Sequence, residues 1–318
     1  MKYRLIISSI LLSVFSHLFS QTLEELEKKI AEENHISKKI QYDHKYIKGK
    51  PSSTGVKTIS KSYSPQGELL EENTFNNKGE VIGWEKYEYD YNGNRTLYER
   101  ENTNSKYKKA SKYDDSDKLL MEAGFNGAEN FRNEYEYTAD GKVSKITYMS
   151  GNRIVQKITY IYSGSSASVE IYGGGNMLAS KMELKYDAHG NVIEEKKLDV
   201  NGTELEKKIF EYDASGNILK EVKTRKGNFE YSLMYTYDSA NRLLRIAEET
   251  IAKKKYDKKV YTYDVNGNLT EYKWRRNPDD EFNIKKFTYD PKGVCLTEYT
   301  FYPQTKYEVL SKFEYEFH

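Results

Sequence analysis

The sequence predicts an all-β fold: an antiparallel β-meander of roughly twenty strands, curved or coiled into a solenoid-like sheet, with a short N-terminal helix. Three observations support this. A Tyr-Asp turn recurs every 24 to 26 residues, and strand-like alternation flanks each copy. Hydrophobic residues make up 37% of the 318-residue chain, but with 30 tyrosines the aliphatic residues are too scarce for a thick core. Closure of the sheet into a large barrel or partial shell is the alternative.

The first element is a signal peptide spanning residues 1–20. Lys2 and Arg4 precede the apolar residues 5–19, and a small residue precedes Gln21, the expected start of the mature chain. The apolar stretch is short for a membrane span, and a buried N-terminal helix is the alternative. We therefore expect an exported protein (secreted, periplasmic or at the cell surface) with no transmembrane segment in the mature chain.

A helix and linker are expected in residues 21–55. Thr22 and Glu25 form a capping box, which is typical of a helix start. An apolar stripe follows at helical spacing: Leu23, Leu26 and Ile30. The pattern predicts a helix from Thr22 to about Ile40, placed to cover the first edge of the sheet.

Residues 56–318 form the expected repeat domain. The fullest copies of the turn are Tyr89–Asn94, Tyr186–Asn191, Tyr212–Asn217 and Tyr263–Asn268. In these turns Asp accepts hydrogen bonds from nearby backbone amides, and glycines such as Gly216 and Gly267 supply positive φ. Each repeat is then two antiparallel strands joined by such turns. The last strand, which ends at His318, is expected to be an edge protected by charge or a docking site.

Aromatic residues two apart, such as Tyr261 and Tyr263, recur on one face of the strands that lead into the turns. Stacked from strand to strand, they predict a structural ladder, because cross-strand aromatic pairs stabilise sheets. A ligand-stacking platform is the alternative interpretation.

The sequence offers little catalytic chemistry. It has five histidines and one cysteine, Cys295, which we interpret as a strand residue, and no metal-binding, nucleophile or phosphate-loop motif. Turn formation explains the Asp and Asn residues without Ca²⁺. We therefore expect no enzyme activity, no catalytic residues, no metal and no cofactor. Removing Lys2 and Arg4 takes the basic residues from 50 to 48 against 49 acidic ones, which argues against nucleic acid as a partner.

The best candidate for a binding surface is the sequence around Trp274. Tyr272 and Trp274 share one face of a predicted strand, and Arg275 and Arg276 follow directly. Aromatic faces stack on sugars, and the arginines can donate to hydroxyls or carboxylates. The alternative is that Trp274 is one more packed strand residue.

These Tyr-Asp-x-x-Gly-Asn turns resemble the YD repeats of the Rhs family, from about Tyr63 to His318. The resemblance implies spiralling β-sheets, often a hollow shell around a toxin domain, with links to carbohydrate binding and surface contacts. The chain is far shorter than the shell-forming members, and no toxin domain or self-cleaving protease core is recognisable in it. We expect the repeat module alone. MORN-like repeat proteins are the nearest rival.

These observations predict an exported, non-enzymatic scaffold or binding protein that recognises a glycan or protein partner at the cell envelope or outside the cell. One alternative is an immunity-type protein that captures a toxin by edge-strand pairing. Another is a secreted hydrolase whose site the sequence does not reveal.

Overall fold

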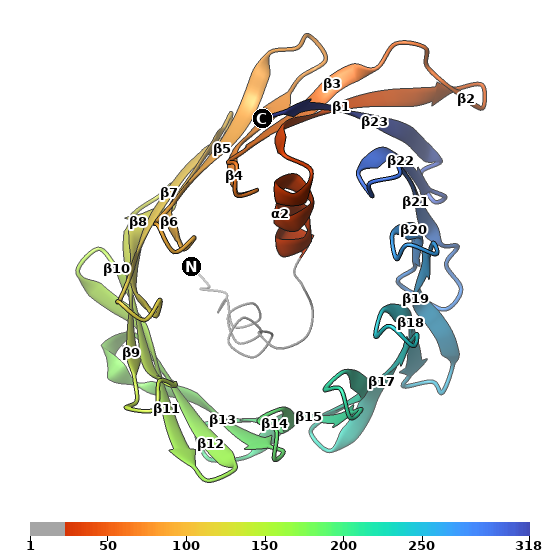
Figure 1. Ribbon diagram of the computed structural model, residues 1–318. Coiled ribbons are helices and arrows are strands. Elements are labelled where there is room, and N and C mark those ends of the chain that lie inside the picture. The colour runs from red at the N-terminus through yellow and green to blue at the C-terminus, as the bar shows by residue number, and fades with distance from the viewer. Residues whose placement is uncertain (1–22) are drawn as a thin grey trace.

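The structure of the protein is a computed structural model that describes residues 23–318 (Figure 1). The expected signal peptide, residues 1–20, and its cleavage before Gln21 lie outside the described residues. The helical elements are α2 (Leu23–Glu33) and a 3-10 turn, η1 (Gly174–Asn176).

The other elements are strands, which follow one another along the chain with short turns between them. In order they are β1 (Ile36–Ile47), β2 (Lys50–Pro51), β3 (Val56–Tyr63), β4 (Leu69–Phe75), β5 (Val81–Tyr89), β6 (Arg95–Asn102), β7 (Ser105–Tyr113), β8 (Leu119–Phe125), β9 (Asn130–Tyr137), β10 (Val143–Ser150), β11 (Arg153–Ser163), β12 (Ser166–Gly173), β13 (Leu178–Tyr186), β14 (Val192–Leu198), β15 (Glu204–Tyr212), β16 (Ile218–Arg225), β17 (Asn228–Tyr237), β18 (Leu243–Thr250), β19 (Lys255–Tyr263), β20 (Leu269–Trp274), β21 (Asn283–Tyr289), β22 (Cys295–Tyr302) and β23 (Tyr307–Phe317).

The sheet closes on itself. Each strand from β3 onwards pairs antiparallel with the next, and β1 pairs with both β3 and β23, so 22 of the 23 strands form a barrel (Figure 1). Strand β2 pairs only with β1. The expected open, solenoid-like sheet was therefore wrong, and the alternative of closure is the one observed. Closure satisfies the backbone groups that two free edges would leave unpaired.

The last strand is not an edge. On one side β23 pairs with β22, and on the other its Tyr315 and Phe313 lie opposite Lys39 and Gln41 of β1. The amide of His318 donates to the carbonyl of His35 at 2.8 Å. The predicted free edge was wrong, and this removes the basis for toxin capture by pairing with that strand.

Helix α2 is shorter than the sequence pattern suggested. It ends at Glu33, and His35 has a φ of 53°, which turns the chain into β1. The predicted continuation to about Ile40 was wrong because Ile36–Ile47 pair on both sides as a strand. The barrel therefore begins inside the range 21–55 assigned to helix and linker. Instead of covering an edge, α2 lies inside the ring of strands (Figure 1).

The Tyr-Asp turns share one hydrogen-bond pattern. In the turn after β15, Asp213 Oδ1 accepts from the amides of Ser215 and Asn217 at 2.8 and 2.9 Å, and Oδ2 accepts from Asn217 Nδ2 at 2.9 Å. The side-chain bond from Asn217, together with the backbone amides, holds the pKa of Asp213 below its ordinary value of 3.8. The donors of the turn itself thus occupy the Asp carboxylate.

Most of the tyrosines that precede these turns tie their turn to the preceding repeat. Tyr212 Oη donates to the carbonyl of Val192, the first residue of β14, at 2.7 Å. The same bond, always to the first residue of the strand that follows the preceding turn, occurs at Tyr89, Tyr113, Tyr137, Tyr162, Tyr212, Tyr237, Tyr263, Tyr289 and Tyr315. Phenylalanine would fill the same space but has no hydroxyl donor. The bond thus explains why the repeat uses tyrosine.

The turn glycines have the predicted conformation. Gly216 and Gly267 have φ values of 85° and 92°, and a Cβ on Gly267 would lie 3.0 Å from Arg242 Nη1. Gly267→Val should therefore destabilise the protein by roughly 1–3 kcal/mol, because a β-branched residue is strained at positive φ. His189→Ser, at an exposed turn position, should stay within about 0.5 kcal/mol. Urea unfolding of both variants tests this, and equal midpoints would contradict the turn geometry.

The largest apolar cluster lies on β10 to β13. Its most buried side chains, each at most 1% exposed, are Ile146, Val169, Ile171 and Leu184. Strand β12 alternates buried Ala167, Val169 and Ile171 with half-buried neighbours, as one packed face of a sheet requires. This cluster is the main hydrophobic core of a barrel that elsewhere relies on tyrosines and ion pairs.

Candidate functional site

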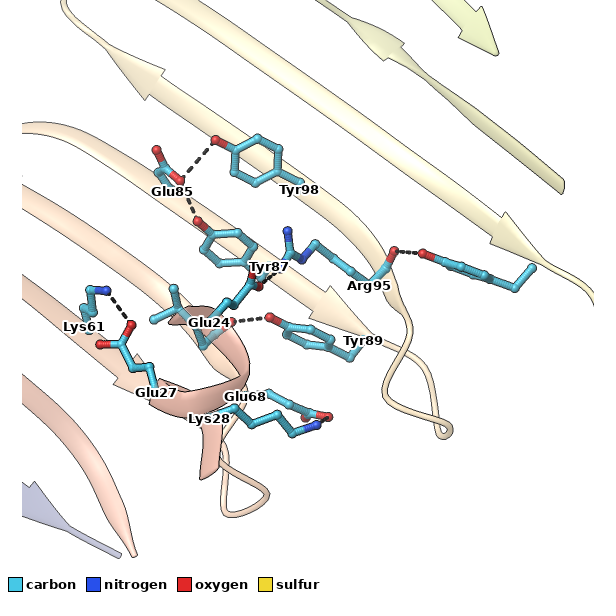
Figure 2. A network of polar contacts seen from close by, with 12 residues as sticks. Glu24, Glu27, Lys28, Lys61, Glu68, Glu85, Tyr87, Tyr89, Arg95 and Tyr98 are labelled. Atoms are coloured by element: carbon cyan, nitrogen blue, oxygen red, sulfur yellow. Dashed lines mark hydrogen bonds and ion pairs between the residues drawn. The ribbon is translucent and has the colours of Figure 1, made fainter. Parts of the chain in front are cut away.

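Contacts with α2 identify the inner face of the barrel. Glu27 of α2 accepts from Tyr63 Oη at 2.8 Å. It also pairs with Lys61 Nζ at 2.9 Å (Figure 2). Because side chains alternate along a strand, Tyr63 and Lys61 lie on one face, which is the face toward the helix. By the same alternation and the repeat, the Tyr-Asp tyrosines and the residues two before them line the interior.

The inner face carries paired charges around α2. Burial alone would raise the pKa of Glu27, but the charges of Lys39 and Lys61 and the hydrogen bonds from Lys61 and Tyr63 hold it below 4.5. Figure 2 shows the continuation of this network to Glu24, which pairs with Arg95, and to Lys28, which pairs with Glu68. Ion pairs therefore supply much of the attachment of the helix to the wall.

A run of aromatic rings lies on the inner face of β19, β20, β22 and β23. Tyr272 stacks on Tyr261 with 4.9 Å between ring centroids and on Trp274 with 4.8 Å. Trp274 meets Tyr302 edge-on at 5.9 Å, and Tyr302 meets Tyr307 at 6.0 Å. We call these five residues the aromatic row. Tyr307 is 45% exposed and the others are half-buried, so the rings are neither fully packed nor free.

The structure brings together two of the four predicted site residues. Tyr272 and Trp274 stack within the aromatic row. Arg275 instead donates from Nε to the Asp257 carbonyl at 2.8 Å and from Nη1 to the Pro278 carbonyl at 2.9 Å. The side chain of Arg276 is exposed. Tyr272 and Trp274 are thus the members of the predicted site that present aromatic surface, while two donors of Arg275 are engaged.

Ring stacking along the Tyr-Asp face is local. A second run joins four rings, Tyr87, Tyr98, Tyr107 and Phe131, and Tyr160 stacks on Tyr162. The row around Trp274, with five rings, is the longest chain of ring contacts in the described residues. Sequence reasoning missed Tyr302 and Tyr307, which flank the hairpin turn between β22 and β23. Their position on either side of a Pro-containing turn was the available signal.

Two other residues with possible chemistry lie elsewhere. Trp84 is on β5, where it alternates with the inner residues Glu85 and Tyr87 and so lies on the opposite, outer face. The Lys86 ammonium lies 5.2 Å from its ring centroid. Cys295 is a strand residue, as expected, at the start of β22. Burial raises the pKa of its thiol to about 11, so it is protonated at neutral pH.

The inner carboxylate of Glu195 has neither an ion pair nor a hydrogen bond among the described residues. Glu195 belongs to β14 and lies opposite Lys208 of β15. Burial raises its pKa above 4.5, with the Lys208 charge opposing and the Glu221 charge adding to the rise. Sequence reasoning did not single out this residue, because Glu is common throughout the repeats.

Among the described residues, no group of three or more His, Cys, Asp or Glu side chains is placed to hold a metal ion. In the same part of the chain, no helix has the length and apolar character needed to cross a membrane.

The fold and its turns define a class: a closed antiparallel barrel of hairpin repeats joined by Tyr-Asp turns. Residues 157–309 match the family model described as Teneurin YD-shell. Together with the turns, this match confirms the resemblance to YD-repeat proteins that was seen in the sequence. No match was found among curated proteins.

Similar solved structures include a TcdB2-TccC3 protein without its hypervariable C-terminal region, at 12% identity and a TM-score of 0.38. That alignment covers 81% of this chain and 14% of the other, so this chain spans a small part of that protein. A porin-like protein from Bacteroides uniformis is similar at 10% identity and a TM-score of 0.34, over 88% of this chain and 98% of the other. One from Bacteroides vulgatus is similar at 11% identity and a TM-score of 0.26, over 89% and 99%.

Proposed function

We propose that the protein is an exported, non-enzymatic YD-repeat scaffold that binds a glycan on the aromatic row. The observation that carries this proposal is the set of stacked, half-buried rings at Tyr261, Tyr272 and Trp274. Tyrosine and tryptophan offer flat apolar faces to sugar rings and a polar edge to their hydroxyls. Rings that stack in a row across neighbouring strands present successive ring edges and partly free faces, which suit a chain of sugars better than a single sugar.

Export is supported by the order of residues at the N-terminus. A positive pair, Lys2 and Arg4, an apolar stretch and a small residue before Gln21 are typical of a secretory signal. The glycan would then be one met at the cell envelope or outside the cell.

The non-enzymatic part of the proposal is supported by the inner carboxylates. Glu122 is paired with Lys109 at 2.5 Å and accepts from Tyr135, and Glu298 is paired with Lys285 at 2.5 Å. Such partners occupy both carboxylates instead of leaving them free to exchange protons with a substrate. Glu195 is the residue to examine first if turnover is found, because a buried carboxyl with a raised pKa can act as a general acid.

Trp274→Ala should weaken binding of an oligosaccharide by about tenfold or more, because it removes the largest face of the aromatic row. The matched control is Trp84→Ala, which removes the only other tryptophan, at a position outside the row. Calorimetric titration with a panel of neutral and acidic hexasaccharides measures both, with circular dichroism to confirm β structure.

Equal losses in the two variants, or no binding by the parent protein to any member of the panel, would contradict the proposal. Hydrolysis of a bound hexasaccharide that is abolished by Glu195→Gln would contradict the non-enzymatic part specifically.

A further inference from the structure

Lys259 lies beside the aromatic row. It is the cross-strand partner of Trp274, and it is two residues from Tyr261 on the same face of β19. Side chains of directly opposed residues in an antiparallel pair lie about 5 Å apart at Cβ, so the lysine stem runs next to the indole. Within residues 23–318, Lys259 has no hydrogen bond, ion pair or ring contact.

Neighbouring inner lysines are neutralised. Lys258 pairs with Glu248, and Lys285, which lies opposite Tyr272, pairs with Glu298. Lys259, a half-buried lysine without a carboxylate partner, therefore differs from these two neighbours.

Arg275 adds a second uncompensated charge. Its side-chain hydrogen bonds all go to backbone carbonyls, those of Asp257, Pro278 and Asp280. Its guanidinium lies over Phe282 at 4.5 Å and over Tyr256 at 5.3 Å. No carboxylate within the described part of the chain forms a salt bridge with it. Among the described residues, Lys259 and Arg275 thus both lack a carboxylate partner.

We propose that the aromatic row takes an acidic saccharide, with a sugar carboxylate paired to the Lys259 ammonium while the ring stacks on Trp274. This rests on the proposed function and specifies its ligand class. A carboxylate of the sugar would give Lys259 the ion-pair partner that it lacks within the protein. A charge-assisted hydrogen bond is stronger than one between neutral groups. Arg275 contributes through its field, because its donors are already engaged.

The test uses two hexasaccharides that differ only at their carboxyl groups: a hexamer of galacturonic acid and the same hexamer with its carboxylates methyl-esterified and therefore uncharged. At low salt the parent protein should bind the acid about tenfold more tightly than the ester, and this preference should shrink as salt is raised. Lys259→Gln should abolish the preference and leave affinity for the ester unchanged. Lys86→Gln, which alters the lysine beside Trp84, should retain the preference.

Equal affinity for the two hexamers, or a preference that survives Lys259→Gln, would overturn the acidic-sugar inference while glycan binding stands. Equal binding of a hexaglutamate peptide would overturn it by showing that charge alone suffices. If neither hexamer binds, this inference fails, and the proposed function fails with it only when the neutral members of the panel also do not bind.

Discussion

Ile171→Ala is expected to lower the free energy of unfolding by about 2–5 kcal/mol, the range for removing a fully buried aliphatic side chain and leaving a cavity. Ile171 is 1% exposed and lies opposite Ile158 and Ser180 on the neighbouring strands. Elsewhere the barrel has few aliphatic residues on its inner face. Few apolar side chains around this cluster can therefore shift to fill the cavity left by the substitution. Urea unfolding followed by circular dichroism gives the midpoint.

Ile161→Ala is the matched control. It removes the same side chain from β11, where Ile161 is 53% exposed, and should cost less than about 1 kcal/mol. Similar losses in the two variants would show that the core does not lie where β10 to β13 place it.

Glu27→Ala is expected to destabilise the protein by about 2–4 kcal/mol, because it removes the carboxylate that accepts from Lys39, Lys61 and Tyr63. The Lys39 and Lys61 side chains are 24% and 20% exposed, so water replaces the lost carboxylate only in part. The helix should also become easier to detach, which amide hydrogen exchange along α2 would report as faster exchange.

Glu24→Ala serves as its control on the same helix. Glu24 pairs with Arg95 but its side chain is 61% exposed, so its loss should stay within about 1 kcal/mol. An unfolding midpoint and exchange rates that are the same in both variants would contradict the placement of Glu27 against the wall.

Much of the repeat architecture could be predicted from the sequence. The Tyr-Asp spacing predicted roughly twenty antiparallel strands, near the 23 that the described residues form, and the turn glycines have the positive φ that their position predicted. Closure could not be predicted, because it depends on pairing between β1 and β23, which are separated by most of the sequence. The sequence of residues Ile36–Ile47 mixes lysines with spaced apolar residues. Because this segment comes directly after a predicted helix, its pattern fits a continued helix as well as it fits a strand.

The candidate site was predictable only in part. Tyr272 and Trp274 alternate on one strand, so their shared face follows from local sequence. Placing Lys259 beside Trp274 requires the register of β19 and β20, which shifts by a bulge between Thr262 and Tyr263. Since a one-residue shift reverses the face of a strand, and most hairpins in this barrel contain such a shift, the sequence alone does not determine which side chains meet.

The closure of the barrel by β1 and β23 is the claim on which the inner face, the helix inside it and the aromatic row all depend. Cysteines at Tyr42 and Lys312, which lie opposite each other on these strands, test it in a Cys295→Ser background. Directly opposed strand residues have Cα atoms about 4.5–5.5 Å apart, within the range of a disulfide. The control pairs Tyr42→Cys with Glu211→Cys on β15, which does not adjoin β1.

After mild oxidation, intact mass and non-reducing electrophoresis should show an intramolecular disulfide in nearly all of the Tyr42→Cys, Lys312→Cys protein and in little of the control. Free thiols or intermolecular dimers in both proteins would contradict closure, because in an open, solenoid-like sheet the first and last strands do not meet.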